Sequence, residues 1–310
     1  MNILIIGATG FIGRELMKEL EQSGHRPVAV TRNTWKAREI FGKKTEIVEW
    51  DGISPGNLAR NFAGIDAIVN LAGESIASGR WTKKRRKEIS ESRINTGKLI
   101  RDAIRISNVK PSVLIQGSAI GYYGIRVEEP AEENHPAGDG FMADLTQDWE
   151  SSVAIAGKMI RRVVIIRTGL VLGKGGELLD RMVLPFKLNF GTVIGSGNQW
   201  MSWIHMNDQV RAIRFLLENE FCSGPYNLTS PNPARMQYFI ESIGETLGKP
   251  VRLKVPGFFL KIALGKMAKE TVLSSQNIYP GKLLKDGFDF EYPELVPALK
   301  SLLNNGKSIK

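Results

Sequence analysis

Three glycines near the start of the chain have the spacing of a loop that binds phosphate. The segment Gly7-Ala-Thr-Gly10-Phe-Ile-Gly13 follows an apolar run, Ile3–Ile6, and precedes an amphipathic stretch. Gly7 permits a tight turn, Gly10 lets the backbone approach a pyrophosphate, and Gly13 lets helix and strand pack closely. The free amides and positive dipole at the start of the helix favour a bound anion. We therefore expect dinucleotide contacts from Gly7, Thr9, Gly10, Phe11, Ile12 and Gly13.

The residues after the next apolar run indicate which dinucleotide is bound. An acidic side chain at this position would bind the ribose 2′-hydroxyl of NAD. The chain instead has Thr31-Arg32, at 18 and 19 residues after Gly13. A guanidinium can stack on adenine and form paired hydrogen bonds to a 2′-phosphate. Thr31 and Arg32 therefore favour NADP(H) over NAD, and Lys36 and Arg38 add positive charge nearby.

The elements that must position this loop alternate along the first half of the chain. Short runs rich in Val and Ile predict strands over Ile3–Ile6, Pro27–Thr31, Glu46–Trp50, Ala67–Asn70, Ser112–Gln116 and Val163–Arg167. Amphipathic stretches predict helices over Ile12–Ser23, Asn57–Phe62, Thr82–Ile106 and Phe141–Gly157. Apolar strands separated by helices are typical of a parallel sheet covered on both faces.

The predicted fold class is therefore α/β, a Rossmann doubly wound parallel sheet with a smaller C-terminal lobe. After about Gly173 the pattern loosens, and prolines divide the chain into short elements. We expect an NADP(H)-binding domain over residues 1–230, of which about 173–202 contribute to the lobe. Residues 231–310 are expected to form the substrate lobe.

The chain resembles the extended (atypical) short-chain dehydrogenase/reductases. The resemblance covers Gly7-x-x-Gly10-x-x-Gly13, Asn70-Leu71-Ala72-Gly73, a serine after the fifth strand, and Arg167–Gly173. It is closer to an NAD-dependent epimerase-like subfamily with a C-terminal domain of unknown function. That similarity lies in Asn70–Glu74, Arg80-Trp81, Ser92-Arg93, Gly121–Gly124, Asp148–Glu150, Trp203–His205 with Asp208, and Pro280 to Pro293.

The resemblance implies further contacts to the cofactor. The loop Leu71-Ala72-Gly73 is expected to pass under the pyrophosphate and ribose, and Leu170 to lie near the nicotinamide. Glu88 and Arg93, on one face of the long helix, are expected to reach the cofactor or the cleft. For Glu88, a solvent-exposed charge on the helix surface is an equal alternative.

The resemblance also implies a catalytic Ser and a Tyr-x-x-x-Lys pair, in which the lysine lowers the tyrosine pKa for proton transfer. Ser118 is present, but Phe141 and Leu145 occupy the places of tyrosine and lysine, and Tyr-x-x-x-Lys occurs nowhere in the chain. Tyr123 and Tyr122, close after Ser118, are the candidate substitutes. Lining of a pocket is the alternative for both tyrosines.

Three interpretations of the function follow. The protein is an NADP(H)-dependent oxidoreductase or epimerase-like enzyme that uses a substitute proton donor on a small carbonyl or hydroxyl compound. Alternatively, it is a reductase that needs little proton transfer, or a regulator or redox sensor that binds NADP(H) without turnover. His205 and Asp208 are expected to be structural, with Asp208 as a helix cap, and a proton donor at His205 is the alternative.

The composition limits the partners. The net charge is +10, with a basic run over Lys83–Lys87. Because Glu88 and Glu91 lie among these bases, the run is typical of a solvated helix face, and a local field that attracts an anionic ligand is the next alternative. The sequence has no helix-turn-helix, zinc-finger or RNP pattern, so we expect no nucleic-acid partner, which is only a weak runner-up from the net charge. One cysteine and three histidines, widely spaced, predict no metal site. We expect a small-molecule substrate, no membrane insertion and a cytoplasmic location; the oligomeric state cannot be predicted from the sequence.

Overall fold

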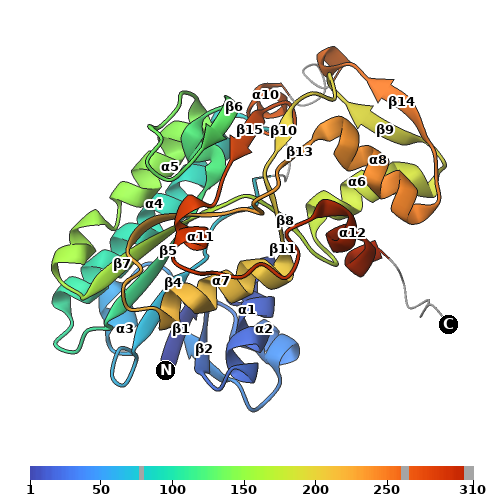
Figure 1. Ribbon diagram of the computed structural model, residues 1–310. Helices are drawn as coiled ribbons and strands as arrows, with labels where there is room; N and C mark the ends of the chain where they lie inside the picture. Colours follow the sequence, from blue (N-terminus) through green and yellow to red (C-terminus); the bar gives the residue numbers. More distant parts are fainter. Residues whose placement is uncertain (77–79, 260–264, 304–310) are drawn as a thin grey trace. The chain divides into compact units, whose positions relative to one another are not determined.

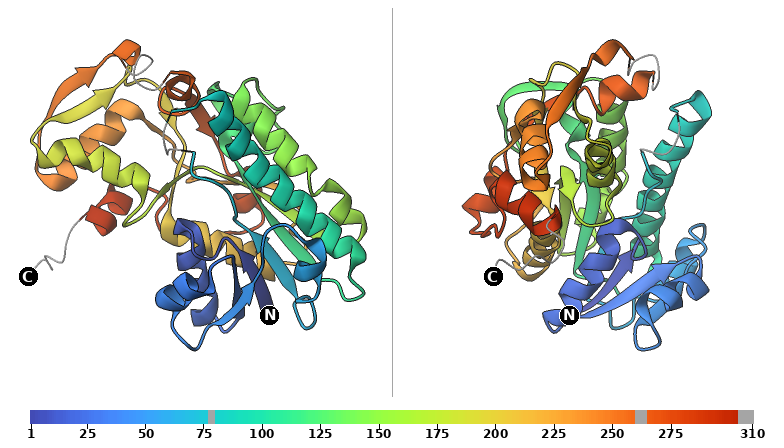
Figure 2. Two further views of the ribbon diagram at one scale, coloured as in Figure 1. Left: turned by 180° about the vertical axis from the view of Figure 1, so that it is seen from behind. Right: turned by 90° about the vertical axis from the view of Figure 1, so that its right-hand side faces the viewer.

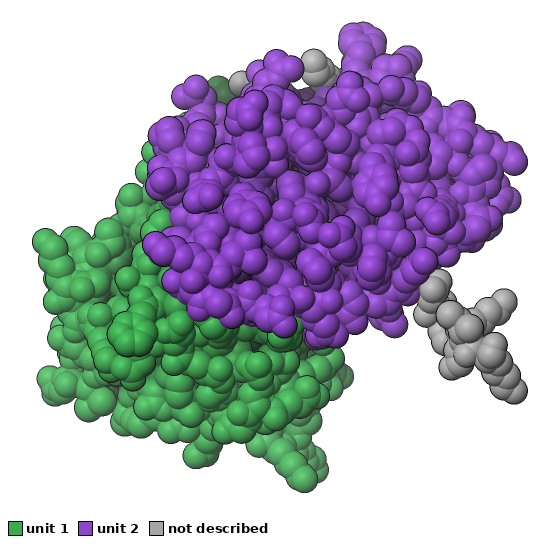
Figure 3. All heavy atoms as spheres, viewed as in Figure 1, with its two compact units in different colours: residues 1–119, 144–167, 210–226 green, residues 120–143, 168–209, 227–310 purple. Residues whose placement is uncertain are grey.

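The computed structural model describes residues 1–76, 80–259 and 265–303. The chain divides into two compact units, which Figure 3 colours separately. Unit 1 comprises residues 1–119, 144–167 and 210–226, and unit 2 comprises residues 120–143, 168–209 and 227–310. The predicted domain boundary differs from this division, because residues 120–143, 168–172, 203–209 and 227–230 group with unit 2.

A seven-stranded sheet, in the order β12-β7-β5-β4-β1-β2-β3, is the centre of the first unit (Figure 1). The pairings from β5 through β3 are parallel. The strands are β1 (Asn2–Ile6), β2 (Arg26–Thr31), β3 (Glu46–Glu49), β4 (Ala67–Asn70), β5 (Val113–Ala119), β7 (Arg162–Thr168) and β12 (Gly224–Leu228). The predicted Rossmann class is confirmed, and all six predicted strands are present: Ala67–Asn70 has its predicted bounds, and the other five differ by one to three residues at one or both ends.

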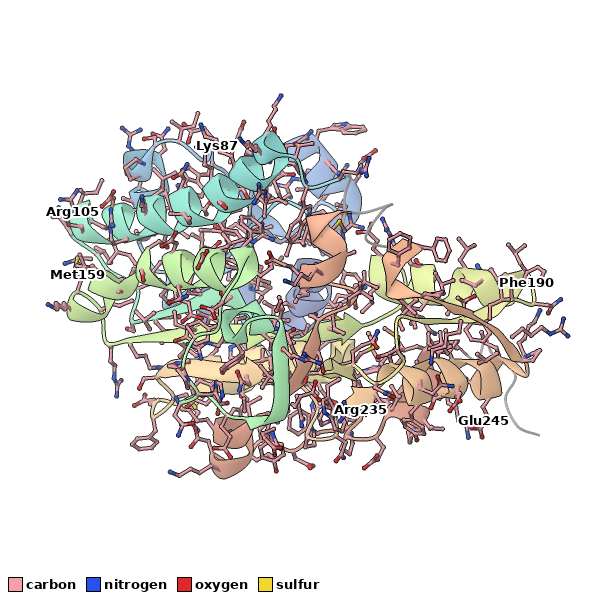
Figure 4. The ribbon with its side chains drawn as sticks, turned by 90° about the horizontal axis from the view of Figure 1, so that it is seen from above. Lys87, Arg105, Met159, Phe190, Arg235 and Glu245 are labelled. Atoms are coloured by element: carbon pink, nitrogen blue, oxygen red, sulfur yellow. The ribbon has the colours of Figure 1, made fainter. Side chains whose placement is uncertain are left out.

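Helices flank this sheet because successive side chains of each strand point to opposite faces. Leu4 and Ile6 of β1 belong to a buried cluster with Ile100 and Ile104, whereas Ile3 and Ile5 are buried on the other face. The helical elements are α1 (Phe11–Gln22), α2 (Thr34–Phe41), α3 (Pro55–Ala59), α4 (Lys83–Ile106), α5 (Phe141–Ser151), the 3-10 turn η2 (Ala154–Lys158) and α7 (Met206–Glu218). The long helix α4 runs beside α5 (Figure 2), and Lys87 and Arg105 mark its two ends in Figure 4.

Local side chains determine where these helices begin and end. Thr82 caps α4 by accepting a hydrogen bond from the Arg85 amide, which confirms the predicted start to within one residue. The helix predicted over Phe141–Gly157 is interrupted after Ser151. Ser152 donates its hydroxyl to the carbonyl of Trp149 at 2.6 Å, and the chain continues as the 3-10 turn η2. The α-helix therefore ends six residues before the predicted end at Gly157.

Short elements around an apolar cluster form unit 2. They are η1 (Ile120–Tyr123), β6 (Arg126–Ala131), β8 (Leu170–Leu172), α6 (Glu177–Lys187), β9 (Gly191–Ile194), β10 (Trp200–Met201), β11 (Trp203–His205), β13 (Ala234–Arg235), α8 (Met236–Leu247), β14 (Val251–Val255), α10 (Lys266–Glu270), β15 (Ser275–Ile278), α11 (Gly281–Lys285) and α12 (Leu295–Leu303). β6 pairs with β15 and β8 with β11, and these pairings group residues 120–143 and 203–209 with unit 2. Phe186, Trp203 and Phe239 are fully buried in its main cluster.

Candidate functional site

The candidate cofactor loop lies where the strand order reverses. β1 is between β2 and β4 in the sheet, and the register pairs Ile6 with Asn70 and with Val30. The segments that follow β1 and β4 are therefore neighbours, and the amide of Leu71 donates to the carbonyl of Ile6 at 2.8 Å. In doubly wound sheets this switch point, at the carboxyl ends of the strands, is where ligands bind.

The turn between β1 and α1 has room only for glycine at two positions. Gly7 has φ +89°, and a Cβ there would lie 2.8 Å from the carbonyl carbon of Leu71. A Cβ on Gly13 would lie 2.3 Å from the carbonyl oxygen of Gly7. Both contacts are with backbone, which cannot move aside as a side chain does. The predicted roles of Gly7 and Gly13 in the turn and in helix–strand packing agree with this geometry.

The start of α1 can receive a phosphate. Gly10 is its N-cap residue and provides no side-chain cap, so the first amides of the helix, including those of Phe11 and Ile12, have no side-chain acceptor there. Thr9 lies in the turn between β1 and α1, and its carbonyl accepts a hydrogen bond from Arg14 Nε at 2.8 Å. Backbone donors combined with a helix dipole suit a pyrophosphate.

The second strand brings a cation to the same edge of the sheet. Thr31 ends β2, and Arg32 is exposed directly after it, beside the turn at Gly52. Lys36 is also exposed, but Arg38 is committed elsewhere, because its Nη1 donates to the carbonyls of Lys43 at 3.1 Å and Thr45 at 2.7 Å. Arg38 therefore stabilises the end of α2, while its charge, like that of Lys36, remains at the surface.

Arg93 is a buried cation beside the loop that follows β4. Its side chain is 7% exposed and lies against Gly73, where a Cβ would be 2.9 Å from Cζ. Cζ is also 5.2 Å from the centroid of the Trp149 ring, and Nη1 donates to the carbonyl of Ile89 at 3.1 Å. Burial lowers the pKa of Arg93 to about 10, so it stays charged at neutral pH. Such a cation attracts an anionic group.

The remaining residues predicted to contact the cofactor lie in different parts of the structure. Ala72 donates its amide to Asn70 Oδ1 at 3.2 Å, which shapes the loop Leu71–Gly73. Glu88 is half-buried and forms an ion pair with Arg85 at 3.2 Å on α4. Leu170 belongs to β8 in unit 2, where it pairs with Trp203.

The hydroxyls of two predicted catalytic residues are engaged in internal hydrogen bonds. Ser118 is 5% exposed and donates to Glu150 Oε1 at 2.7 Å. Tyr123 is 2% exposed and donates to Asn227 Oδ1 at 2.7 Å. Tyr122 is half-buried and contacts the Tyr123 ring edge-on, with a centroid distance of 5.3 Å. Of the three candidates, only Tyr122 is not deeply buried, and Phe141 and Leu145 on α5 cannot transfer a proton.

Glu150 and Arg167 form a buried ion pair that the sequence did not predict. Arg167 donates from Nε and Nη2 to the two carboxylate oxygens of Glu150, both at 2.9 Å, and its side chain is 4% exposed. Ser118 completes this network from β5. The paired geometry is typical of strong Arg–carboxylate recognition. Both charged residues fall in the stretches that resembled the family, but nothing in their spacing indicated that they meet.

His205 and Asp208 have structural roles in unit 2. Nδ1 of His205 accepts a hydrogen bond from the Asn207 amide at 3.1 Å, and the ring stacks on Tyr292 at 4.0 Å between centroids. Asp208 accepts hydrogen bonds from the amides of Glu291 and Tyr292 at 2.8 and 2.9 Å. Burial lowers the pKa of His205 to about 4, so the ring is neutral at pH 7.

With this geometry established, comparison with known proteins assigns the family. The model of the NAD dependent epimerase/dehydratase family matches residues 3–229. The chain belongs to this family. A domain of unknown function, DUF1731, matches residues 255–302, in agreement with the expected C-terminal domain.

Relatives in this family match the chain along its whole length. It is 38% identical over 312 residues to epimerase family protein YfhF of Bacillus subtilis, with both chains fully covered. It is 37% identical to the Arabidopsis thaliana epimerase family protein SDR39U1 homolog, chloroplastic, covering 98% of this chain and 87% of the relative. The crystal structure of human SDR39U1 (isoform 2) with NADPH superposes with a TM-score of 0.88 at 31% identity, covering 98% and 100% of the two chains.

Two further findings concern metals and membranes. Over residues 1–76, 80–259 and 265–303, no group of three His, Cys, Asp or Glu side chains has an arrangement that could hold a metal ion. Within the same ranges, every helix is too short or too polar to span a bilayer.

Breaking the buried ion pair will destabilise the fold. Glu150→Gln leaves the Arg167 charge without its counterion, and we expect a loss of about 3 kcal/mol in the free energy of unfolding. Ser118→Ala should cost about 1 kcal/mol, since it removes one neutral donor. Urea denaturation measures both. Asp144→Asn, an exposed change on the same helix, is the control. Equal stability of Glu150→Gln and the control would contradict the assignment.

The buried histidine makes stability depend on pH. Its folded pKa of about 4 lies below the ordinary value of 6.5, so this contribution is complete above pH 6.5 and is lost as pH falls toward 4. The loss from pH 7 to pH 4 is roughly 3 kcal/mol. We expect His205→Asn, which retains an acceptor near Nδ1, to flatten the decline relative to the unchanged protein. Urea unfolding at each pH tests this, with exposed His135→Asn as the control. Parallel pH profiles for the unchanged protein and His205→Asn would rule it out.

Proposed function

We propose that the protein binds NADP(H) on unit 1 and acts as an NADP(H)-dependent oxidoreductase or epimerase-like enzyme on a small carbonyl or hydroxyl compound. The observation that carries the proposal is the turn after β1, in which Gly7 and Gly13 leave no room for a Cβ and the helix start has no side-chain cap. The human relative was crystallised with NADPH, which supports the same cofactor here.

The adenine, 2′-phosphate, pyrophosphate and adjoining ribose parts of the cofactor have candidate groups in unit 1. The amides of Phe11, Ile12 and Gly13 would hold the pyrophosphate, together with the backbone at Thr9 and Gly10. Thr31 and Arg32 would bind the 2′-phosphate and adenine ends. The loop Leu71–Gly73 would lie beside the pyrophosphate and ribose, with the buried charge of Arg93 drawing the anion toward it. Leu170 and Glu88 remain expectations from the family resemblance.

The chemistry differs from that of relatives with a Tyr-x-x-x-Lys pair. A bound nicotinamide supplies or accepts hydride, whereas the protein must move the accompanying proton. Ser118 and Tyr123 are not retained as catalytic residues, since their hydroxyls donate to Glu150 and Asn227. Tyr122 is retained as the proposed proton donor because its side chain is partly accessible.

One group of observations favours a second function, a non-catalytic NADP(H)-binding regulator or redox sensor. The places of tyrosine and lysine hold Phe141 and Leu145, and two of the three candidate hydroxyls are buried in internal hydrogen bonds. A protein that only senses the cofactor needs the phosphate loop but no proton donor. The two functions therefore share cofactor binding and differ in turnover.

Charge reversal at Arg32 tests the choice of cofactor. In Arg32→Glu the carboxylate repels the 2′-phosphate and can accept a hydrogen bond from a 2′-hydroxyl, so the Kd for NADPH should rise at least about 100-fold. The Kd for NADH should change less than about threefold. Titration calorimetry measures both, with exposed Arg60→Glu as the control. An unchanged NADPH affinity would exclude Arg32 from the site, and no binding of either dinucleotide by the unchanged protein would overturn the proposal.

Turnover separates the enzyme from the regulator. We expect oxidation of NADPH by at least one member of a panel of aldehydes, ketones and quinones, and a fall in kcat of about 100-fold in Tyr122→Phe. Exposed Tyr238→Phe is the matched control and should leave kcat unchanged. If NADPH binds but no compound is reduced, the regulator is favoured. If Tyr122→Phe is as active as the control, Tyr122 is not the proton donor.

A further inference from the structure

Unit 2 contains a cavity of about 650 Å³ that none of the proposed cofactor contacts lines. Its volume falls within the usual range for small-molecule pockets. β6 contributes Arg126 and Glu128, the segment 195–199 forms one rim, and Arg235 lies at the end of β13. Lys269 of α10 also lines it. Figure 4 labels Arg235 at the start of α8, with Glu245 near the end of that helix. We refer to this cavity as the unit 2 pocket.

Arg235 is held rigidly in the pocket wall. Its guanidinium carbon lies 3.8 Å from the centroid of the Trp200 ring, which is a close cation–π contact. Nη1 donates to Glu128 Oε2 at 3.1 Å and to the carbonyl of Asn198. Glu128 also accepts a hydrogen bond from Ser275 Oγ at 2.9 Å, which holds the pKa of this carboxyl below its usual range. Glu128 is therefore ionised at neutral pH and neutralises Arg235.

Two further cationic side chains give the pocket an excess of positive charge. Arg126 and Lys269 are both exposed, and neither forms a salt bridge with another residue in the described part of the chain. Three cations line the pocket against the single carboxylate of Glu128, so two positive charges are not compensated. Such an excess in a concave, partly apolar site raises the local concentration of anions.

The pocket also has an apolar side. Leu273 lies against two glycines, since a Cβ on Gly195 would be 3.0 Å and one on Gly257 3.2 Å from its side chain. Phe258 lines the pocket and is 66% exposed. A large exposed aromatic ring gains free energy when a ligand covers it. The pocket therefore combines an anion site with a surface for an apolar or aromatic group.

From these observations we propose that the unit 2 pocket binds a small organic phosphate monoester whose body is apolar or aromatic. The dianionic phosphate matches the two uncompensated charges of Arg126 and Lys269, whereas a monocarboxylate would leave one charge without a counterion. Phe258 and Leu273 contact the organic body. The proposal does not depend on NADP(H), whose loop belongs to unit 1.

Titration calorimetry at low ionic strength with phenyl phosphate, benzoate and inorganic phosphate tests the proposal. Phenyl phosphate should bind more tightly than either other probe, because it alone supplies both the dianion and the ring. The double variant Arg126→Gln/Lys269→Gln should weaken it at least about tenfold, since two charge-assisted contacts are lost. The control Arg252→Gln/Lys254→Gln removes two exposed charges of β14 in the same unit and should change the affinity less than about twofold.

A third variant tests the contribution of the ligand's aromatic ring separately from that of its phosphate. Phe258→Ala should weaken phenyl phosphate severalfold and leave inorganic phosphate unchanged, because only the ring is lost from the contact. Circular dichroism and melting temperature verify that each variant is folded.

Four results would overturn the proposal. No binding of phenyl phosphate to the unchanged protein excludes the pocket as a phosphate site. If the control Arg252→Gln/Lys254→Gln loses as much affinity for phenyl phosphate, binding depends on net charge alone. If Arg32→Glu loses phenyl phosphate binding while Arg126→Gln/Lys269→Gln binds it fully, the phosphate is bound at the cofactor loop. Benzoate binding as tight as phenyl phosphate excludes selection for a dianion.

Discussion

The steric constraint at the first turn of the chain organises unit 1. Gly7, with its positive φ, lies against the backbone of Leu71, and a Cβ on Gly13 would meet the carbonyl of Gly7. Because no side chain fits, the end of β1, the start of α1 and the loop after β4 come within backbone contact of each other. The N-cap residue of α1, Gly10, has no side chain, so the first amides of the helix also lack a side-chain cap at this closely packed turn.

The parts of the fold that the sequence predicted are those that backbone periodicity determines. Ala67–Asn70 was predicted with its bounds, and Thr82–Ile106 differs from α4 only by its cap residue. Buried strands give continuous apolar runs, and a long helix repeats its pattern often enough to be recognised. α2 is only eight residues long and was missed for want of such repeats. The pairing of β6 with β15 joins segments well over a hundred residues apart and leaves no local signal.

The same distinction between local pattern and distant contacts applies to the candidate site. The glycines and Arg32 could be proposed as candidates because a phosphate loop is made of backbone at fixed spacing, and the cation follows the second strand directly. Hydroxyl groups are different, since their chemistry depends on whether another side chain already uses them. Ser118 and Tyr123 have the right residue types, yet Glu150 and Asn227, which accept their hydrogen bonds, are 32 and 104 positions away in the chain. Spacing alone could not reveal those partners.

The basic residues of the chain likewise lie in several different environments, which composition cannot distinguish. In the basic run, Arg85 pairs with Glu88 and Lys87 with Glu91 at 3.2 and 3.7 Å. Arg167 is buried, but Glu150 neutralises it through two hydrogen bonds. Arg93 is equally buried, yet in the described ranges no carboxylate lies within salt-bridge distance of it, and an aromatic ring and a glycine surround it instead. Burying a cation without a counterion costs free energy, and an anionic ligand offsets that cost. Arg93 therefore differs from Arg167 in being buried without a neutralising salt bridge among the described residues.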